Sequence, residues 1–293
     1  MKVAIFGYGK LGKCLEKCIQ ADNNMQLEAI FSRRKIPHEK YVPASDLAQY
    51  IGKIDVVAIA TGSKEDITNS DLKYFNTVDS YDVHQRIDSH KQQLNDDNTL
   101  SIVSVGWDPG ILSIQRALCH SLSNKGVYTF WGKGVSQGHS NALMQIEGVK
   151  DAIQFTVPNS KAIQLARQGI ASDEPHTRVC YINCDKSKRE EITEKVLNTP
   201  YYFQGYPVKI YFVSGEKIRT LWQNTSHKGL TVSSGDCWQT EYRIHTDNNA
   251  LFTAQIMCSY IKAIPRLIDD GYTGVADPLD IPIKYIVDNK SML

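Results

Sequence analysis

The apolar residues at the start of the chain fall into two short runs joined by one amphipathic segment. Residues 2–6 and 27–31 are apolar runs of strand length, and apolar side chains recur between them at helical spacing from Leu11 to Ile19. Runs of this length predict buried strands, and the stripe between them predicts a helix that packs on a sheet. The opening therefore has the order and length of a parallel strand-helix-strand unit.

Further apolar runs at residues 56–60, 77–78 and 100–104 predict three more strands. Polar or helical segments separate them, as a doubly wound parallel sheet requires. Two of the runs lead into unusual loops at residues 61–63 and 106–110. Ligands of open parallel sheets bind beyond the carboxyl ends of the strands, so these loops are candidate binding segments.

After about residue 118 the pattern changes to an alternation of apolar and polar residues. Residues 179–183 and 208–212 alternate in this way and predict half-exposed strands, so we expect an antiparallel substrate-binding domain. Apolar residues return to near-helical spacing between Phe252 and Ile261. We expect this last segment to pack back on the first domain.

These patterns together predict an α/β protein with two domains. The first is a Rossmann-type doubly wound parallel sheet in residues 1–118, completed by residues 249–293, and the second is an α+β domain in residues 119–248. The chain has 293 residues, of which 42% are hydrophobic, which is enough to build a sizeable core.

The charge of the chain is nearly balanced, with 33 Lys and Arg residues against 32 Asp and Glu residues. This balance argues against nucleic acid or an anionic membrane surface as the partner. Residues 1–7 contain too few apolar side chains for a signal peptide, and no apolar run reaches the roughly 18 residues of a membrane-spanning helix. We therefore expect a cytoplasmic protein that acts on a small molecule.

The seven cysteines form an odd set without a Cys-x-x-Cys pair. This spacing favours neither a disulfide framework nor a zinc site, so we expect reduced thiols and no metal.

The segment Gly-Tyr-Gly-Lys-Leu-Gly at residues 7–12 carries the first chemical signal. It follows a predicted strand and opens a predicted helix, which is the context of a dinucleotide-binding loop. Gly7 would permit the tight turn, Gly9 would let the backbone approach a pyrophosphate, and Gly12 would let the helix pack close to the strand. The alternative is an ordinary glycine turn.

The second predicted strand ends in Ser32, Arg33 and Arg34. An NAD enzyme places a carboxylate at this point for the ribose 2′-hydroxyl, whereas a hydroxyl and two guanidinium groups bind a 2′-phosphate. The segment favours NADP over NAD, although it is also compatible with a solvated basic corner.

Carboxylates follow the fourth and fifth predicted strands. Asp79 and Asp82 come after residues 77–78, and Asp108 lies in the Gly-Trp-Asp-Pro-Gly loop at residues 106–110. Asp82 and Asp108 would both face the nicotinamide end of the cleft, where they suit an ammonium group beside the carbon that loses hydride. Alternatively, Asp79 or Asp82 caps a helix and Asp108 forms a turn before proline.

The later part of the chain offers weaker signals. The glycine-rich loop at residues 131–140 can bring backbone amides close to a carboxylate, or it can serve as a domain hinge. Arg178 can clamp a carboxylate through two hydrogen bonds, although an isolated arginine is usually a surface residue. His227 and Asn249 are no stronger by themselves.

Five ordered segments, taken together, closely resemble the meso-diaminopimelate dehydrogenase family over nearly the whole chain. They are Gly-Tyr-Gly-Lys-Leu-Gly at 7–12, Phe-Ser-Arg-Arg at 31–34, Val-Asp-Ser-Tyr-Asp at 78–82, Gly-Trp-Asp-Pro-Gly at 106–110, and Phe-Trp-Gly with Ser-Gln-Gly-His-Ser at 130–140. The resemblance implies NADP-dependent, reversible oxidative deamination of the D-centre of meso-2,6-diaminopimelate to L-2-amino-6-oxopimelate and ammonia. It also implies a homodimer in which residues 119–248 bind substrate and mediate dimerisation.

The resemblance also implies which residues contact each ligand. The expected cofactor contacts, which include the glycine loop, are Gly7, Tyr8, Gly9, Lys10, Leu11, Gly12, Ser32, Arg33, Arg34, Thr61, Gly62, Ser63, Ser80, Tyr81, Gly106 and Pro109. The expected catalytic residues are Asp82 and Asp108, and the expected substrate contacts are these two with Trp131, Ser136, Gln137, Gly138, Thr156, Arg178, His227 and Asn249.

Three other kinds of protein are less favoured. A sugar dehydrogenase of the glucose-fructose oxidoreductase type would usually show Glu-Lys-Pro where Val78, Asp79 and Ser80 stand, and a dihydrodipicolinate reductase would show a His-His pair followed by lysine. A catalytically silent NADP sensor remains possible, but it has no reason to place two aspartates beside the nicotinamide.

Overall fold

The computed structural model describes residues 1–62, 69–83, 86–223 and 226–287. Contacts divide the chain into unit 1, residues 1–115 and 250–293, and unit 2, residues 116–249. The predicted domain limits at 118/119 and 248/249 differ from these divisions by a few residues at most. Both the predicted limit at 118/119 and the observed division at 115/116 fall inside helix α3 (Ile111–Leu122).

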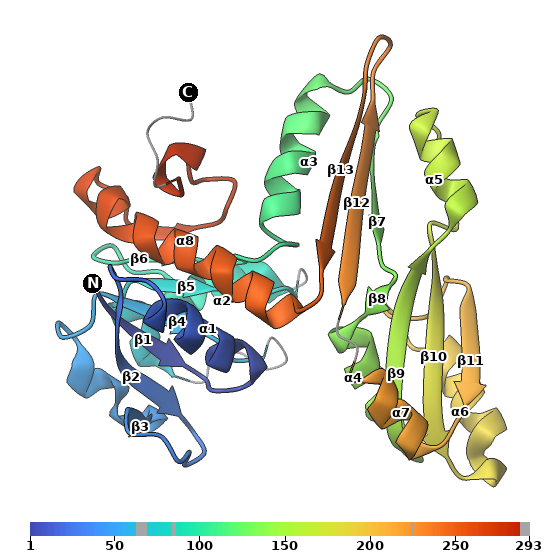
Figure 1. Cartoon of the computed structure of the whole chain (residues 1–293), viewed down its shortest axis with the longest axis horizontal. Coiled ribbons are helices and arrows are strands. Elements are labelled where there is room, and N and C mark those ends of the chain that lie inside the picture. The colour runs from blue at the N-terminus through green and yellow to red at the C-terminus, as the bar shows by residue number, and fades with distance from the viewer. Residues whose placement is uncertain (63–68, 84–85, 224–225, 288–293) are drawn as a thin grey trace. The chain divides into compact units, whose positions relative to one another are not determined.

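Unit 1 is built on a seven-stranded parallel sheet with the strand order β14-β6-β5-β4-β1-β2-β3 (Figure 1). Its strands are β1 (Lys2–Phe6), β2 (Gln26–Ser32), β3 (Tyr41–Pro43), β4 (Val56–Ile59), β5 (Thr77–Asp79), β6 (Leu100–Ile102) and β14 (Gly274–Ala276). The chain moves outward from β1 in one direction and then returns to pair β4 with β1. The strand order therefore reverses between β1 and β4, which is where such sheets bind their ligands.

The helical segments of unit 1 connect or follow these strands. They are α1 (Lys10–Gln20), η1 (Ala44–Tyr50), η2 (Ser70–Tyr74), α2 (Ile87–Leu94), the first half of α3, α8 (Asn249–Asp269) and η5 (Ile283–Tyr285). The C-terminal segment contributes β14, which pairs with β6 as the last strand of the sheet.

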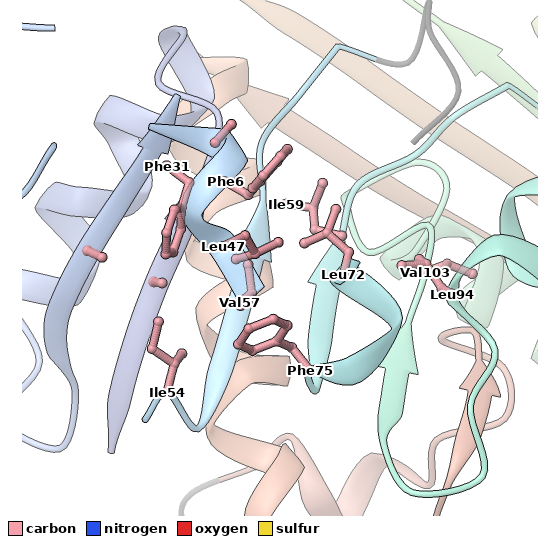
Figure 2. Packing of buried hydrophobic residues seen from close by; sticks show 13 residues of the cluster. Phe6, Phe31, Leu47, Ile54, Val57, Ile59, Leu72, Phe75, Leu94 and Val103 are labelled. Atoms are coloured by element: carbon pink, nitrogen blue, oxygen red, sulfur yellow. The ribbon is translucent and has the colours of Figure 1, made fainter. Parts of the chain in front are cut away.

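One apolar cluster fills the space between the sheet and the short helices η1 and η2. Phe6, Phe31 and Ile59 project from the strands toward Leu47 and Leu72, as Figure 2 shows. All five side chains are at most 4% exposed. At roughly 1.5 to 3 kcal/mol for each fully buried large apolar side chain, this cluster fixes the strand ends that carry the candidate site.

Unit 2 contains two sheets. A four-stranded sheet has the order β11-β10-β9-β8, and a three-stranded sheet has the order β13-β12-β7. The strands are β7 (Val127–Trp131), β8 (Gly134–Val135), β9 (Val149–Pro158), β10 (His176–Cys184), β11 (Val208–Phe212), β12 (His227–Ser234) and β13 (Gln239–Thr246). The helices are α4 (Gln137–Met144), α5 (Ser160–Arg167), η4 (Lys186–Lys188), α6 (Arg189–Leu197) and α7 (Gly215–Leu221).

The expectation of an antiparallel second domain is wrong for one pair of strands. β10 and β11 run parallel, whereas the other paired strands of unit 2 are antiparallel. The connection from β10 to β11 passes through helix α6, and a crossover of that kind returns the chain in the same direction. The alternating pattern predicted the strands but contains no information about their direction.

No helix of the described residues is long and apolar enough to cross a membrane. Among the same residues, no group of three His, Cys, Asp or Glu side chains is arranged to hold a metal ion.

Candidate active site

The glycine loop between β1 and α1 leaves open space at the start of the helix. A methyl group added at Gly7, where φ is +102°, would lie 2.9 Å from the carbonyl carbon of Ala60, and one added at Gly12 would lie 2.2 Å from the carbonyl oxygen of Gly7. A methyl group added at Gly9 would meet no atom within 4 Å. Gly7 and Gly12 thus serve close packing, while Gly9 keeps the N-terminus of α1 accessible to a phosphate.

The basic segment after β2 begins beside this loop. The Gly7 amide donates a 2.8 Å hydrogen bond to the carbonyl of Phe31, and Ser32, Arg33 and Arg34 follow directly. The Ser32 hydroxyl accepts a hydrogen bond from the Arg34 amide, and both arginines are exposed. The residues present therefore fit a dinucleotide with a 2′-phosphate: a helix N-terminus for the pyrophosphate and two guanidinium groups near the ribose.

Tyr8 is fixed by a polar network that the sequence did not reveal. Its hydroxyl donates to Glu16, whose carboxylate also bonds His38 Nε2 at 2.8 Å. The rings of Tyr8 and His38 lie edge to face with centroids 5.6 Å apart. Burial and the neighbouring Glu16 carboxylate raise the pKa of Tyr8 to about 12, so the side chain stays a neutral donor. No local signal links Glu16 to His38, because they are 22 positions apart.

The remaining predicted cofactor residues of unit 1 occupy helix and strand ends. Lys10 and Leu11 form the first turn of α1, and Thr61 and Gly62 are exposed just beyond β4. Ser63 lies outside the described residues. Ser80 and Tyr81 follow β5.

Asp82 and Asp108 follow the neighbouring strands β5 and β6. The Val105 amide donates a 2.7 Å hydrogen bond to the carbonyl of Asp79, which joins the backbones just beyond the two strands. Asp82 lies three residues after one end of this bond and Asp108 lies three residues after the other. Asp82 is exposed and Asp108 is half-buried.

The loop that carries Asp108 is a tight turn. The Ile111 amide donates to the carbonyl of Gly106 at 3.0 Å, and Gly110 has φ +128°. A methyl group at Gly110 would lie 1.9 Å from the carbonyl oxygen of Gly106. Asp108 and Pro109 therefore stand at the tip of a loop whose ends only glycine can close. The alternative interpretation of Asp108, a turn before proline, agrees with this local structure and does not exclude a functional role.

In unit 2, three strands bring Arg178, Thr156 and Gly134 into register. Arg178 on β10 pairs with Thr156 on β9, which pairs with Gly134 on β8. The Arg178 Nη1 donates to Thr156 Oγ1 at 2.9 Å, and its guanidinium lies 4.4 Å from the centre of the Tyr206 ring. Arg178 is not the surface residue that an isolated arginine usually is, since only 7% of it is exposed.

The buried Arg178 has unmet bonding capacity. Its Nε is buried without a hydrogen-bond partner, and no carboxylate in the part of the chain that the structure describes forms an ion pair with it. Burial lowers the pKa of Arg178, and the nearby Tyr206 opposes that shift. A buried cation without an anion is costly, so an anionic ligand group at this point would be stabilised strongly.

Trp131 and His227 belong to the same part of unit 2. The Trp131 amide donates to His176 Nε2 at 2.8 Å, and the rings of Trp131 and His176 have centroids 5.3 Å apart. A methyl group at Gly134 would lie 2.6 Å from the His227 ring, so His227 packs directly on the strand that faces Thr156. His176 was not predicted; it lies two residues before Arg178, but nothing local to the sequence indicates its contact with Trp131.

The Ser-Gln-Gly-His-Ser segment connects to Thr156 through a buried chain of hydrogen bonds. Ser136 caps helix α4, and its hydroxyl lies 2.6 Å from His139 Nδ1. The Ser140 hydroxyl accepts from the Gln154 amide, and Gln154 Nε2 donates to Thr156 Oγ1 at 3.4 Å. Gln137 is the first residue of α4, and Gly138 is exposed. The loop is therefore part of the Arg178 cluster, defined here as Trp131, Ser136, His139, Gln154, Thr156, His176, Arg178 and His227.

Two histidines in this cluster are held neutral. Burial, with a smaller contribution from the positive charge of Arg178, lowers the pKa of His139 to about 3 and that of His176 to about 4. With these two histidines neutral, the positive charge beside them is that of the Arg178 guanidinium, which attracts an anion. Asn249 is half-buried and opens helix α8 at the end of unit 2.

The chain is similar to known proteins in sequence and in fold. The family described as "Diaminopimelic acid dehydrogenase C-terminal domain" matches residues 106–248. The meso-diaminopimelate D-dehydrogenase of Corynebacterium glutamicum is 35% identical over 300 residues, which cover 96% of this chain and 93% of that protein. This chain belongs to the meso-diaminopimelate dehydrogenase family. The predicted family and enzyme class are thereby confirmed, and the alternatives of a sugar dehydrogenase or a silent sensor are not favoured.

Further known proteins resemble this chain in sequence and in fold. The meso-diaminopimelate D-dehydrogenase of Ureibacillus thermosphaericus is 33% identical over 306 residues, covering 96% of this chain and 94% of that protein. A C. glutamicum DAP dehydrogenase solved in complex with DAP superposes with a TM-score of 0.91 at 31% identity, covering 99% of this chain and 96% of that one. An engineered D-amino acid dehydrogenase bound to NADP+ superposes with a TM-score of 0.86 at 30% identity, covering 99% and 97%. The predicted fold class is confirmed.

Proposed function

We propose that this protein is an NADP-dependent meso-2,6-diaminopimelate D-dehydrogenase. It converts the D-centre of the substrate reversibly to a ketone, giving L-2-amino-6-oxopimelate, ammonia and NADPH. The observation that carries the proposal is the similarity along 96% or more of the chain to dehydrogenases named for this substrate, one of them solved with DAP. The glycine loop and the Arg178 cluster supply the chemistry that such a substrate and cofactor need.

The residues of unit 1 hold the cofactor and the reacting amine. Gly9 and the N-terminus of α1 take the pyrophosphate, and Ser32, Arg33 and Arg34 take the 2′-phosphate. When bound, NADP accepts the hydride from the α-carbon of the substrate. Asp82 and Asp108 attract and orient the substrate ammonium group. Their negative charge by itself disfavours loss of its proton, so we assign them a positioning role and assign the proton to water.

The Arg178 cluster binds a carboxylate of the substrate. The guanidinium is buried, it is oriented by Thr156 and Tyr206, and its Nε has hydrogen-bonding capacity to spare. Because the two flanking histidines are neutral, the carboxylate meets one positive charge rather than three. We also propose contacts from Trp131, Ser136, Gln137, Gly138, His227 and Asn249, a homodimeric assembly, and a cytoplasmic location.

The proposal is tested by NADPH formation, followed by absorbance, with meso-diaminopimelate as substrate. The variant Asp108→Asn should lower kcat/KM by about 100-fold or more, since a charge-assisted contact to the ammonium is lost, while the Kd for NADP changes by less than about twofold. Asp88→Asn is a matched control, because Asp88 is an exposed carboxylate in the first turn of α2 in the same unit. Tight NADP binding by the wild-type protein without turnover would favour a cofactor sensor instead.

A further inference from the structure

Asp79, the last residue of β5, has a buried carboxylate that accepts hydrogen bonds from three directions. Its Oδ1 accepts from the amides of Tyr81 at 2.9 Å and Ser104 at 3.1 Å, and its Oδ2 accepts from His90 Nε2 at 2.6 Å. Only 2% of Asp79 and 6% of His90 are exposed. A carboxylate this deeply buried is stable only when its oxygens are satisfied, so each of these donors matters to it.

These bonds continue the connection between β5 and β6 beyond the point where their pairing ends. The last paired residues of the two strands are Val78 and Ile102. After them, the Asp79 side chain bonds the Ser104 amide, and the Asp79 carbonyl accepts the Val105 amide. Ser104 has φ +61°, a conformation that is uncommon for a residue with a side chain and that must be held by its surroundings.

His90 adds a third element, helix α2. Its ring stacks on the Tyr81 ring with centroids 3.8 Å apart and planes 11° apart. Tyr81 is 6% exposed and immediately precedes Asp82. The ring of His90 thus holds the Tyr81 side chain, while its Nε2 holds the carboxylate that binds the Tyr81 amide.

We propose that Asp79 and His90 are positioning residues that fix the segments carrying Asp82 and Asp108 relative to each other. A backbone hydrogen bond joins Asp79 and Val105. Asp82 lies three residues after Asp79, and Asp108 lies three residues after Val105. This inference rests on the proposed function, since it assigns Asp79 and His90 a role in orienting the two aspartates for the reacting amine. A shift of about 1 Å in such a group can lower the rate by roughly 100-fold.

Three variants of His90 distinguish its hydrogen bond to Asp79 from its stacking on Tyr81. His90→Phe keeps a ring that can stack on Tyr81 but has no donor for Asp79. His90→Gln places an amide nitrogen near the position of Nε2, whereas the side chain of His90→Asn is one methylene shorter and does not reach Asp79. We expect kcat with meso-diaminopimelate to fall by about 10- to 100-fold in His90→Phe and His90→Asn, and by less than about fivefold in His90→Gln. The Kd for NADP should stay within about twofold in His90→Phe, which keeps a ring against the proposed cofactor contact Tyr81.

Thr77→Val is the matched control for lost stability. Thr77 Oγ1 donates to Ser101 Oγ at 2.9 Å, and this bond joins the same two strands at their other end, with both residues fully buried. Its loss should lower the melting temperature as the His90 variants do, but it should leave kcat within about twofold of wild type, since no loop residue is displaced. Hydrogen exchange of the Tyr81 and Ser104 amides should accelerate in His90→Phe and stay unchanged in Thr77→Val.

Unchanged kcat in His90→Phe, with a melting temperature lowered as in Thr77→Val, would overturn the inference and leave a purely structural pair. If His90→Phe does not fold, the comparison of His90→Gln with His90→Asn decides, and equal kcat values in those two would overturn the inference as well. Absence of turnover by the wild-type protein would instead overturn the proposed function itself, and the inference with it.

Discussion

The glycine loop of unit 1 and the Arg178 cluster of unit 2, which we propose as anion sites, are built in different ways. The glycine loop offers backbone groups of consecutive residues at the N-terminus of α1. Two of its glycines allow close packing, and the third leaves space for a ligand. The Arg178 cluster uses side chains from separate strands, is buried, and contains polar atoms without partners at Arg178 Nε and Gln154 Oε1. The residues of the glycine loop are neighbours in the sequence, whereas the residues of the Arg178 cluster come together only when the strands of unit 2 pair.

The largest effect on stability is expected from a methyl group at Gly12, and it contrasts with the effect of a methyl group at Gly9. Gly12→Ala should destabilise unit 1 by roughly 3 kcal/mol, because the new Cβ would lie 2.2 Å from the backbone oxygen of Gly7 and the backbone would have to shift. Gly9→Ala should cost less than about 1 kcal/mol, because nothing lies within 4 Å of its Cβ. The Gly9 variant should nevertheless bind NADP about tenfold more weakly. Chemical denaturation and NADP titration measure the two effects, and an unchanged Kd in Gly9→Ala would contradict the assigned approach of the pyrophosphate.

Arg178→Met should weaken substrate binding by the Arg178 cluster without lowering the stability of the protein. Loss of the guanidinium should lower kcat/KM for meso-diaminopimelate by about 100-fold or more, since a buried charge pair with the substrate is broken. The free energy of unfolding should stay within about 1 kcal/mol or rise, because a buried cation without an anion is replaced by an apolar side chain. Arg167→Met is the control: its partially exposed ion pair with Glu241 lies in the same unit, and its removal should leave both quantities nearly unchanged. A strong loss of stability in Arg178→Met with kcat/KM retained would make Arg178 a structural residue.

Removal of both guanidinium groups after β2 should weaken the preference for NADP. In the double variant Arg33→Ala and Arg34→Ala, the ratio of kcat/KM for NADP to that for NAD should fall by roughly 30-fold, because charge-assisted bonds to the 2′-phosphate are lost. Lys53→Ala, which removes an exposed positive charge from the same unit, should leave the ratio unchanged. If the double variant keeps its preference, the segment is a solvated basic corner.

The smallest effect concerns the neutral histidines of the Arg178 cluster. The pKa of His176 is lowered from 6.5 to about 4 in the folded protein, so the unfolded chain binds more protons between these values. Stability from this group is complete above pH 6.5 and is lost as the pH falls toward 4, by roughly 2 kcal/mol. His176→Gln should flatten this part of the stability curve, while His245→Gln, which changes an exposed side chain, should leave it as it is. Denaturation midpoints at pH 4.5 and 7 measure the difference, and equal slopes in the wild type and His176→Gln would contradict a buried neutral imidazole.

The sequence predicted those parts of the molecule that depend on neighbouring residues. The strand-helix-strand opening was predicted because apolar period, glycine spacing and helix start all lie within residues 2–31. The strand at 208–212 was predicted with its observed bounds, but its parallel direction was not, since direction depends on the path of the connection. Strand 100–104 is shorter than expected, since β6 ends at Ile102. Beyond it, the Val103 amide bonds the carbonyl of Ala276 on β14, and the Ser104 amide bonds the Asp79 side chain.

The polar networks could not be predicted because their members meet only in the folded chain. The bonds of Glu16 with His38 and of Trp131 with His176 join residues 22 and 45 positions apart. Arg178 was identified through the family resemblance, but its burial and its contact with Tyr206 follow from the pairing of β9, β10 and β11. Asp79 was considered as a helix cap, and its bond to His90 required the position of α2.

The most direct measurement is NADP reduction by the purified protein with each diaminopimelate stereoisomer in turn, with ammonia assayed in parallel. The account predicts that meso-diaminopimelate yields NADPH and ammonia in equal amounts and that the L,L isomer, which has no D-centre, yields neither. Oxidation of the L,L isomer at a comparable rate, or no NADPH from the meso isomer, would contradict it.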